Sequence, residues 1–164
     1  MAGISGFAAA ASLNVNTTTL TDIIQIKAPA TTGVYFRPRC TCAGQDATAD
    51  HPVFEIVEVS DSDGTSSSIA ANAATTTALG AGVWKNDPRE LAAVLSTFRG
   101  GFTGSVGDPS TPRLFDRQSR RPDGGSYVAP MYFYLPAGRR AALRVKRASA
   151  AAGCTLHPVI DFVE

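Results

Sequence analysis

The amino-acid sequence predicts a mainly all-β domain: an antiparallel β-sandwich with jelly-roll-like connections and one short inserted α-helix. Charged residues make up only 18% of the 164-residue chain, below the roughly 25% of an average domain. Thr, Ser, Ala and Gly take much of their place, which is typical of strands and turns and not of long solvated helices. Short segments that alternate apolar and polar residues recur between Gly- and Pro-containing turns. These features favour about seven short strands in two packed sheets.

The first half of the chain contains three of the predicted strands. Apolar and polar residues alternate over the first, residues 20–27. The second, residues 34–42, contains Pro38, which has no N–H to donate, so this strand is expected at a sheet edge or interrupted by a bulge. The third, residues 53–59, has apolar side chains on both faces and is therefore expected in the centre of a sheet.

The second half contains further predicted strands, a short one over 113–117 and longer ones over 127–135, 141–147 and 155–163. Within 141–147, apolar residues alternate with Arg144 and Lys146. This alternation is typical of an antiparallel strand with one solvated face, so both basic side chains are expected to point into solvent.

One segment carries the signals of an α-helix, near residues 88–99. Asp87 is a suitable N-cap, Pro88 suits the first helical position, and Gly100 ends the segment. Four apolar residues follow the cap at helical spacing: Leu91, Val94, Leu95 and Phe98. The sequence therefore predicts one short amphipathic helix inserted among the strands.

Residues 1–16 are rich in Ala, Gly, Ser and Asn and show no sustained period, so they are predicted to form an N-terminal arm on a single domain over 17–164. The arm carries three isolated apolar anchors: Ile4, Phe7 and Leu13. Two interpretations remain open, an arm that a neighbouring molecule orders and a frayed terminus. Residues 60–82 and 101–112 are predicted to be long irregular connections.

Charge and hydropathy argue against two classes of partner. With 15 basic and 14 acidic residues, the net charge of +1 is too small to bind nucleic acid by counterion release. The basic residues gather in the last third of the chain, where solvated positions or ion pairs are expected. No apolar run reaches the roughly 18 residues of a membrane helix, and no signal peptide is recognised. Neither nucleic acid nor a membrane is expected as a partner.

The cysteines have neither the even number nor the spacing of a disulfide framework, and free thiols in a reducing cytoplasm are predicted for all three: Cys40, Cys42 and Cys154. A zinc site is disfavoured because Cys-x-Cys is not the usual ligand spacing, and His51 and His157 stand near no other ligand in the sequence. Residues 61–64 place their glycine too early for a calcium loop.

No catalytic motif is present. The sequence contains no Gly-x-Ser-x-Gly elbow, no Gly-x-x-x-x-Gly-Lys phosphate loop and no Gly-x-Gly-x-x-Gly fingerprint. The carboxylates of Glu55 and Glu58 would point to opposite faces of their strand. The sequence therefore predicts a protein that is not an enzyme and uses no cofactor, metal or small-molecule substrate.

Packing against other protein subunits is the function that remains. The aromatic residues 132–134 and Trp84 suit a core or a subunit interface better than a sugar-binding or nucleic-acid-binding surface. The predicted interface residues come from the arm, from the single tryptophan and from the basic C-terminal third: Ile4, Phe7, Leu13, Trp84, Arg120, Arg121, Arg144 and Lys146.

The order of segments resembles that of a family of tailed-bacteriophage virion proteins, the small β-sandwich proteins that decorate or cement the capsid. The resemblance is carried by the strand and turn at 23–30, the strand 53–59 with the turn 63–67, the loop 121–125 and the segment 136–145. Together these segments span most of residues 20–164.

The resemblance implies a structural protein that binds the outside of an assembled capsid, after synthesis in the host cytoplasm. It would brace neighbouring major capsid protein subunits, as a homotrimer at symmetry points of the lattice, where repetition of weak contacts gives avidity. The alternative is another virion component: a head-fibre base, a tail component or a carbohydrate-binding spike module.

Overall fold

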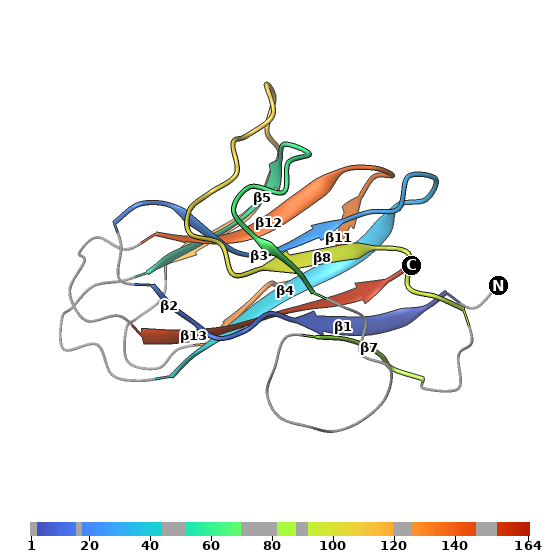
Figure 1. The fold of residues 1–164 in the computed structure, drawn as a ribbon, viewed down its shortest axis with the longest axis horizontal. Helices are drawn as coiled ribbons and strands as arrows, with labels where there is room; N and C mark the ends of the chain where they lie inside the picture. Colours follow the sequence, from blue (N-terminus) through green and yellow to red (C-terminus); the bar gives the residue numbers. More distant parts are fainter. Residues whose placement is uncertain are drawn as a thin grey trace.

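The computed structural model describes residues 3–15, 18–43, 52–69, 82–87, 92–119, 126–146 and 154–164. These residues form thirteen β-strands and no helix, which confirms the predicted all-β class. The strands make two antiparallel sheets that pack face to face as a β-sandwich (Figure 1). None of the described segments forms a helix that is long and apolar enough to cross a membrane.

The seven-stranded sheet has the order β10-β4-β13-β1-β7, with β11 paired to β4 and β2 paired to β13. Its strands are β1 (Ser5–Ala9), β2 (Leu13–Val15), β4 (Val34–Ala43), β7 (Gly82–Lys85), β10 (Tyr127–Val128), β11 (Phe133–Leu135) and β13 (Cys154–Val163). The long strands β4 and β13 lie side by side at its centre, cyan and red in Figure 1, and β1 follows on the far side of β13.

The six-stranded sheet has the order β6-β8-β3-β12-β5-β9. Its strands are β3 (Thr21–Lys27), β5 (Val53–Val59), β6 (Ser67–Ile69), β8 (Thr97–Gly100), β9 (Leu114–Ser119) and β12 (Arg140–Lys146). The chain passes repeatedly from one sheet to the other, as β3 to β4 to β5 and as β11 to β12 to β13. Such crossings are typical of β-sandwiches, in which neither sheet is built from one continuous segment.

The hydrophobic core lies between the sheets and is closed by aromatic contacts that bridge them. Phe98 on β8 meets Phe162 on β13 with ring centroids 5.1 Å apart. Phe54 on β5 stacks on Tyr127 on β10 at 5.2 Å. All four rings are buried, and full burial of such a side chain contributes about 1.5–3 kcal/mol. These contacts fix which face of each sheet points inward.

The predicted strands are present, except that the single strand expected over 127–135 is two short strands, β10 and β11. The interpretation of 34–42 as a strand is confirmed, but the expectation that Pro38 places it at a sheet edge or interrupts it with a bulge is wrong, because β4 is continuous and lies between two neighbours. On one side it pairs with β13, and on the other β11 pairs with Val34 to Phe36 and β10 pairs with Arg39 and Cys40. Between these two short strands, the carbonyl of Pro38 accepts a hydrogen bond from the Ala129 N–H at 3.0 Å. The partner strand is therefore broken where Pro38 cannot donate.

The predicted helix over 88–99 is wrong. Residues 88–91 lie outside the described residues, 92–96 form no helix, and 97–100 form strand β8 between β3 and β6. Phe98 pairs with Ile26 on one side and with Ile69 on the other. The apolar spacing fits a helix, but pairing with two strands overrides that local preference in so short a segment.

The predicted N-terminal arm over 1–16 is also wrong for the residues described. β1 lies inside the seven-stranded sheet, paired with β13 on one side and with β7 on the other. Its inward-facing residues are small: Gly6 lies against the ring of Phe162, and Ala8 is fully buried. The Ala- and Gly-rich composition therefore reflects close packing and not freedom from the domain.

The prediction of three free thiols is wrong for Cys42, which is disulfide-bonded. Cys40 is free and buried. The two residues share the inner face of β4, but Cys42 stands near the end of the strand and is only partly buried. The thiol of Cys40 therefore lies inside the core, and the sulfur of Cys42 lies at the edge of the core.

We expect Cys40 to resist alkylation in the folded protein. Burial raises the pKa of the Cys40 thiol from 9.0 to about 12, against a weaker opposing effect of a backbone hydrogen bond from His157. At pH 8 the thiol stays protonated and shielded, so it is a poor nucleophile. Mass spectrometry after iodoacetamide treatment should find Cys40 unmodified in native protein and modified in urea. Rapid native labelling would contradict the burial of this side chain.

Candidate protein-binding face

The seven-stranded sheet presents an alternating set of side chains on its outer face. On β4, residues Val34, Phe36 and Cys40 point into the core, so that Tyr35, Arg37 and Arg39 point outward. The same alternation on β13 buries Ile160 and Phe162 and turns Val159, Asp161 and Val163 outward. The outward residues of neighbouring strands stand in register and form rows across the sheet.

The first row consists of apolar and aromatic side chains. Tyr134 on β11 pairs with Tyr35 on β4, and Tyr35 pairs with Val163 on β13. The rings of the two tyrosines lie 5.2 Å apart, and these side chains remain 45% and 53% exposed. Two large rings therefore remain accessible beside an exposed valine, where the outer face of an antiparallel sheet is commonly polar.

The second row combines aromatic and charged side chains. Phe7 on β1 pairs with Asp161 on β13 and with Trp84 on β7. The Phe7 and Trp84 rings are stacked, with centroids 5.0 Å apart. At the other end of the row, the guanidinium of Arg37 lies 6.0 Å from the Tyr132 ring centroid. Stacked rings and a cation over a ring hold these side chains in a fixed arrangement.

A third row continues the surface with Val128, Arg39 and Val159. Arg39 forms an ion pair with Asp161, with an Nε to Oδ2 distance of 3.2 Å, which links this row to the second. We call the three rows the aromatic face: Phe7, Tyr35, Arg37, Arg39, Trp84, Val128, Tyr132, Tyr134, Val159, Asp161 and Val163. Tyr, Trp, Phe and Arg are the residues enriched at the centres of protein interfaces.

The outer face of the six-stranded sheet differs because the chain itself covers it. Phe102 and Val106, from the connection after β8, pack on Val57, Val59 and Ala142 in a small second core. Backbone hydrogen bonds fasten this connection, from the Asp22 N–H to the Gly104 carbonyl at 3.2 Å and from the Ser60 N–H to the Gly107 carbonyl at 3.0 Å. The chain thus covers the outer face of one sheet around β5 and β12, while the other sheet leaves its aromatic face exposed.

A buried ion-pair network also fastens this connection. Arg144 on β12 is 2% exposed, and its Nε lies 2.5 Å from Oδ1 of Asp22, which is fully buried. The same guanidinium bonds Asp108 at 2.5 Å and donates to the Val106 carbonyl. Burial raises the pKa of the Asp22 carboxyl above 3.8, and the Arg144 charge and hydrogen bonds from Val106 and Gln25 oppose that rise.

The expectation of a half-solvated strand over 141–147 is therefore wrong. Every residue of β12 is buried except Lys146 at its end. Arg144, predicted at a protein interface, is enclosed by the connection that follows β8 and has no free surface to offer a partner.

The remaining predicted interface residues lie in different places. Phe7 and Trp84 meet on the aromatic face. Ile4 and Leu13 are partly buried against the core, and Lys146 is exposed on the other sheet. The last two, Arg120 and Arg121, lie outside the described residues.

The prediction overlooked Tyr35, Val163 and the separate orientations of residues 132–134. Tyr132 and Tyr134 are exposed, whereas Phe133 between them packs against the core. The alternation within β4 and β13 could have predicted two of these positions. Tyr35 and Val163 are next to the buried Phe36 and Phe162 along their strands, so they point to the opposite, outer face.

Among the described residues, no group of three or more His, Cys, Asp and Glu side chains is arranged to hold a metal ion. Nothing in the aromatic face resembles a catalytic constellation either, because its one carboxylate, Asp161, is paired with Arg39. The chain matches no family model, no curated protein and no solved structure.

Proposed function

We propose that this protein is a structural subunit that binds other protein subunits through its aromatic face. The supporting observation is the asymmetry of the sandwich: the chain covers the outer face of one sheet and leaves tyrosine, tryptophan and arginine side chains accessible on the other. Exposed patches of this composition mark protein contacts in soluble proteins.

We further propose that the partner is the outside of an assembled phage capsid, where the protein decorates or cements neighbouring major capsid protein subunits as a homotrimer. The resemblance of segments 53–59, 63–67 and 136–145 to capsid decoration proteins supports this partner, and the β-sandwich agrees with it. An exposed sheet face suits a lattice because each copy makes the same modest contact and symmetry multiplies the contacts.

The test removes three rings of the aromatic face, with Tyr35→Ser, Trp84→Ser and Tyr134→Ser in one variant. Because an aromatic residue at the centre of an interface often contributes 2 kcal/mol or more, attachment to capsid shells should weaken by more than about 100-fold. Cosedimentation with shells assembled from the major capsid protein alone measures the affinity, and cryo-electron microscopy measures the occupancy.

A matched control is Leu114→Ser. Leu114 is 53% exposed, like Tyr35, but lies on β9 at the edge of the other sheet. This variant should attach like the unaltered protein, and both variants should keep the circular dichroism of the sandwich. Full occupancy by a folded triple variant would refute the aromatic face as the docking surface.

The competing function is that of another virion component, such as a head-fibre base, a tail component or a spike module that binds carbohydrate. The exposed rings of Tyr35, Tyr132 and Tyr134 favour the carbohydrate variant of this idea, because amphipathic rings also stack on sugars. Gold-labelled antibody on native particles distinguishes the two: label confined to the tail would replace capsid decoration with this alternative.

A further inference from the structure

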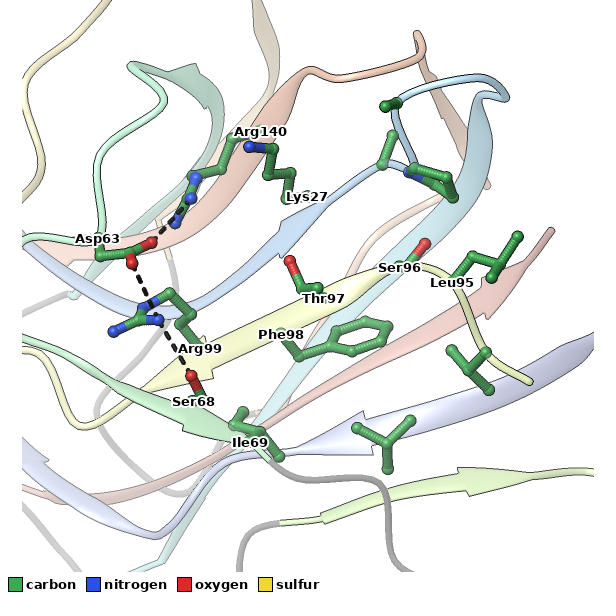
Figure 2. Close-up of a pocket in the computed structure, with 15 residues that line it drawn as sticks. Lys27, Asp63, Ser68, Ile69, Leu95, Ser96, Thr97, Phe98, Arg99 and Arg140 are labelled. Carbon is green, nitrogen blue, oxygen red and sulfur yellow. Dashed lines mark hydrogen bonds and ion pairs between the residues drawn. The ribbon is translucent and has the colours of Figure 1, made fainter.

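A cavity of 560 Å³ opens at one end of the six-stranded sheet (Figure 2). β3, β6, β8 and β12 contribute to its walls, together with Asp63 from the connection before β6. Lys27, Arg99 and Arg140 make its charged side. Pro29, Leu95 and Phe98 make an apolar side.

Strand register brings the three cations together. Lys27 on β3 pairs with Arg140 on β12 and with Thr97 on β8. Arg99, two residues along β8 from Thr97, therefore points to the same face of the sheet and stands beside Ser68 of β6. Two guanidinium groups and one ammonium group thus border a single opening, together with the hydroxyl groups of Ser68, Ser96 and Thr97, all labelled in Figure 2.

The charges of this group do not balance. Lys27 is 2.6 Å from Asp61, and Arg140 is 2.9 Å from both Asp61 and Asp63. Arg99 is 3.2 Å from Asp63, which lies between the two guanidinium groups in Figure 2. Three cations share two carboxylates in these ion pairs. The hydrogen bond from Lys27, with help from Arg140, keeps the pKa of Asp61 below its ordinary 3.8, so the Asp61 carboxylate keeps its charge near neutral pH.

One donor in the cavity wall has no acceptor. Arg140 is 5% exposed; its Nη1 donates to Gln25 at 3.1 Å and its Nη2 to the two aspartates, but its Nε has no partner. Among the described residues, the buried side-chain polar atoms without a partner are this Nε and the Oγ of Ser96, and both residues line the cavity. An unsatisfied buried donor costs about 1–3 kcal/mol, so such groups indicate a missing ligand or water.

We propose that this cavity binds a small organic phosphate. Paired guanidinium groups with a lysine form the set of donors that recognises phosphate oxygens, and the excess positive charge favours an anion. The phosphoryl oxygens would accept from Arg140 Nε, Lys27 and Arg99, after entering past the Lys27 and Asp63 side chains, which are partly exposed. The organic part of the ligand would lie on Leu95 and Pro29. The residues that line the site are all different from those of the aromatic face.

The first test titrates phenyl phosphate into the full-length protein labelled with ¹⁵N. The Nε–H resonance of Arg140 should move with saturation, because this hydrogen gains an acceptor. Isothermal titration calorimetry should show phenyl phosphate binding at least about tenfold more tightly than inorganic phosphate or phenol, since each of these lacks one half of the ligand. An Arg140 resonance that stays in place at saturation would overturn the proposal.

The second test uses variants with opposite expected effects. Lys27→Gln removes a cation and should weaken phenyl phosphate binding about fivefold, whereas Asp63→Asn removes a competing carboxylate and should tighten it by about the same factor. A variant that merely loses its fold cannot bind more tightly. Lys146→Gln changes the same charge at the far end of β12 and should have no effect. Weaker binding by Asp63→Asn, or equal losses in the two lysine variants, would also overturn the proposal.

Discussion

Replacing Arg144 with Met is expected to destabilise the fold by about 3–5 kcal/mol, because the Asp22 carboxylate then stays buried without its cation. The change also removes the bonds to Asp108 and to the Val106 carbonyl that hold the connection after β8 on the sheet. Urea denaturation followed by circular dichroism measures the loss, and hydrogen exchange at Val106 should become faster.

The control for this variant is Lys146→Met, which makes the same kind of change on the same strand at an exposed position. Its effect should stay within about 0.5 kcal/mol, as for most surface substitutions. In the double variant Asp22→Leu with Arg144→Met, part of the lost stability should return, because no unpaired charge remains buried. If Arg144→Met were as harmless as Lys146→Met, the buried ion pair described above would not exist.

The variant Arg144→Met should also differ from the unaltered protein in how its stability depends on pH. In the unaltered protein, Arg144 opposes the rise in the pKa of Asp22 that burial causes, so its removal should raise this pKa further. A raised carboxyl pKa means that the folded state holds a proton which the unfolded chain releases above about pH 4. Relative to the unaltered protein, the stability of Arg144→Met should therefore be least reduced below that pH, and the deficit should grow as the pH rises through the folded-state pKa of Asp22.

Arg144 also shows how much of the structure can be predicted from the sequence. Alternation predicted that residues 141–147 form a strand, and β12 is that strand. Alternation gives the face to which Arg144 points but not what covers that face. The covering residues, Val106 and Asp108, belong to a connection without periodicity, and only the three-dimensional path of the chain places them there.

The aromatic face and the cavity at the end of the six-stranded sheet differ in how much of each the sequence could predict. Tyr35 and Val163 could be assigned to the outer face from their phase in two predicted strands. That these residues stand in one row depends on the pairing of β4 with β13, which the sequence does not specify. The cavity is lined by residues from four separate segments: Lys27, Asp63, Arg99 and Arg140. No local sequence motif therefore predicts it.

Gly6→Ala is expected to destabilise the protein by about 2–3 kcal/mol, in the upper part of the range for overpacking. A Cβ at this position would lie 2.1 Å from the backbone oxygen of Trp84 and 2.8 Å from Cζ of Phe162. Backbone cannot yield as a flexible side chain does, so β1 would have to move away from β7 or from the core. Thermal and chemical denaturation measure the loss.

The matched control is Gly104→Ala, where a Cβ would have no neighbour within 4 Å and the expected change is close to zero. The comparison tests the strand over residues 5–9, because an arm would tolerate both substitutions equally.

The variant Gly6→Ala also tests which part of the aromatic face binds the capsid. Phe7 meets Trp84 only while β1 is paired with β7, so Gly6→Ala should disturb the aromatic face as well. A Gly6→Ala protein that is less stable and still binds shells fully would place the docking contact on the first row, at Tyr35 and Tyr134, and not on the Phe7 and Trp84 pair.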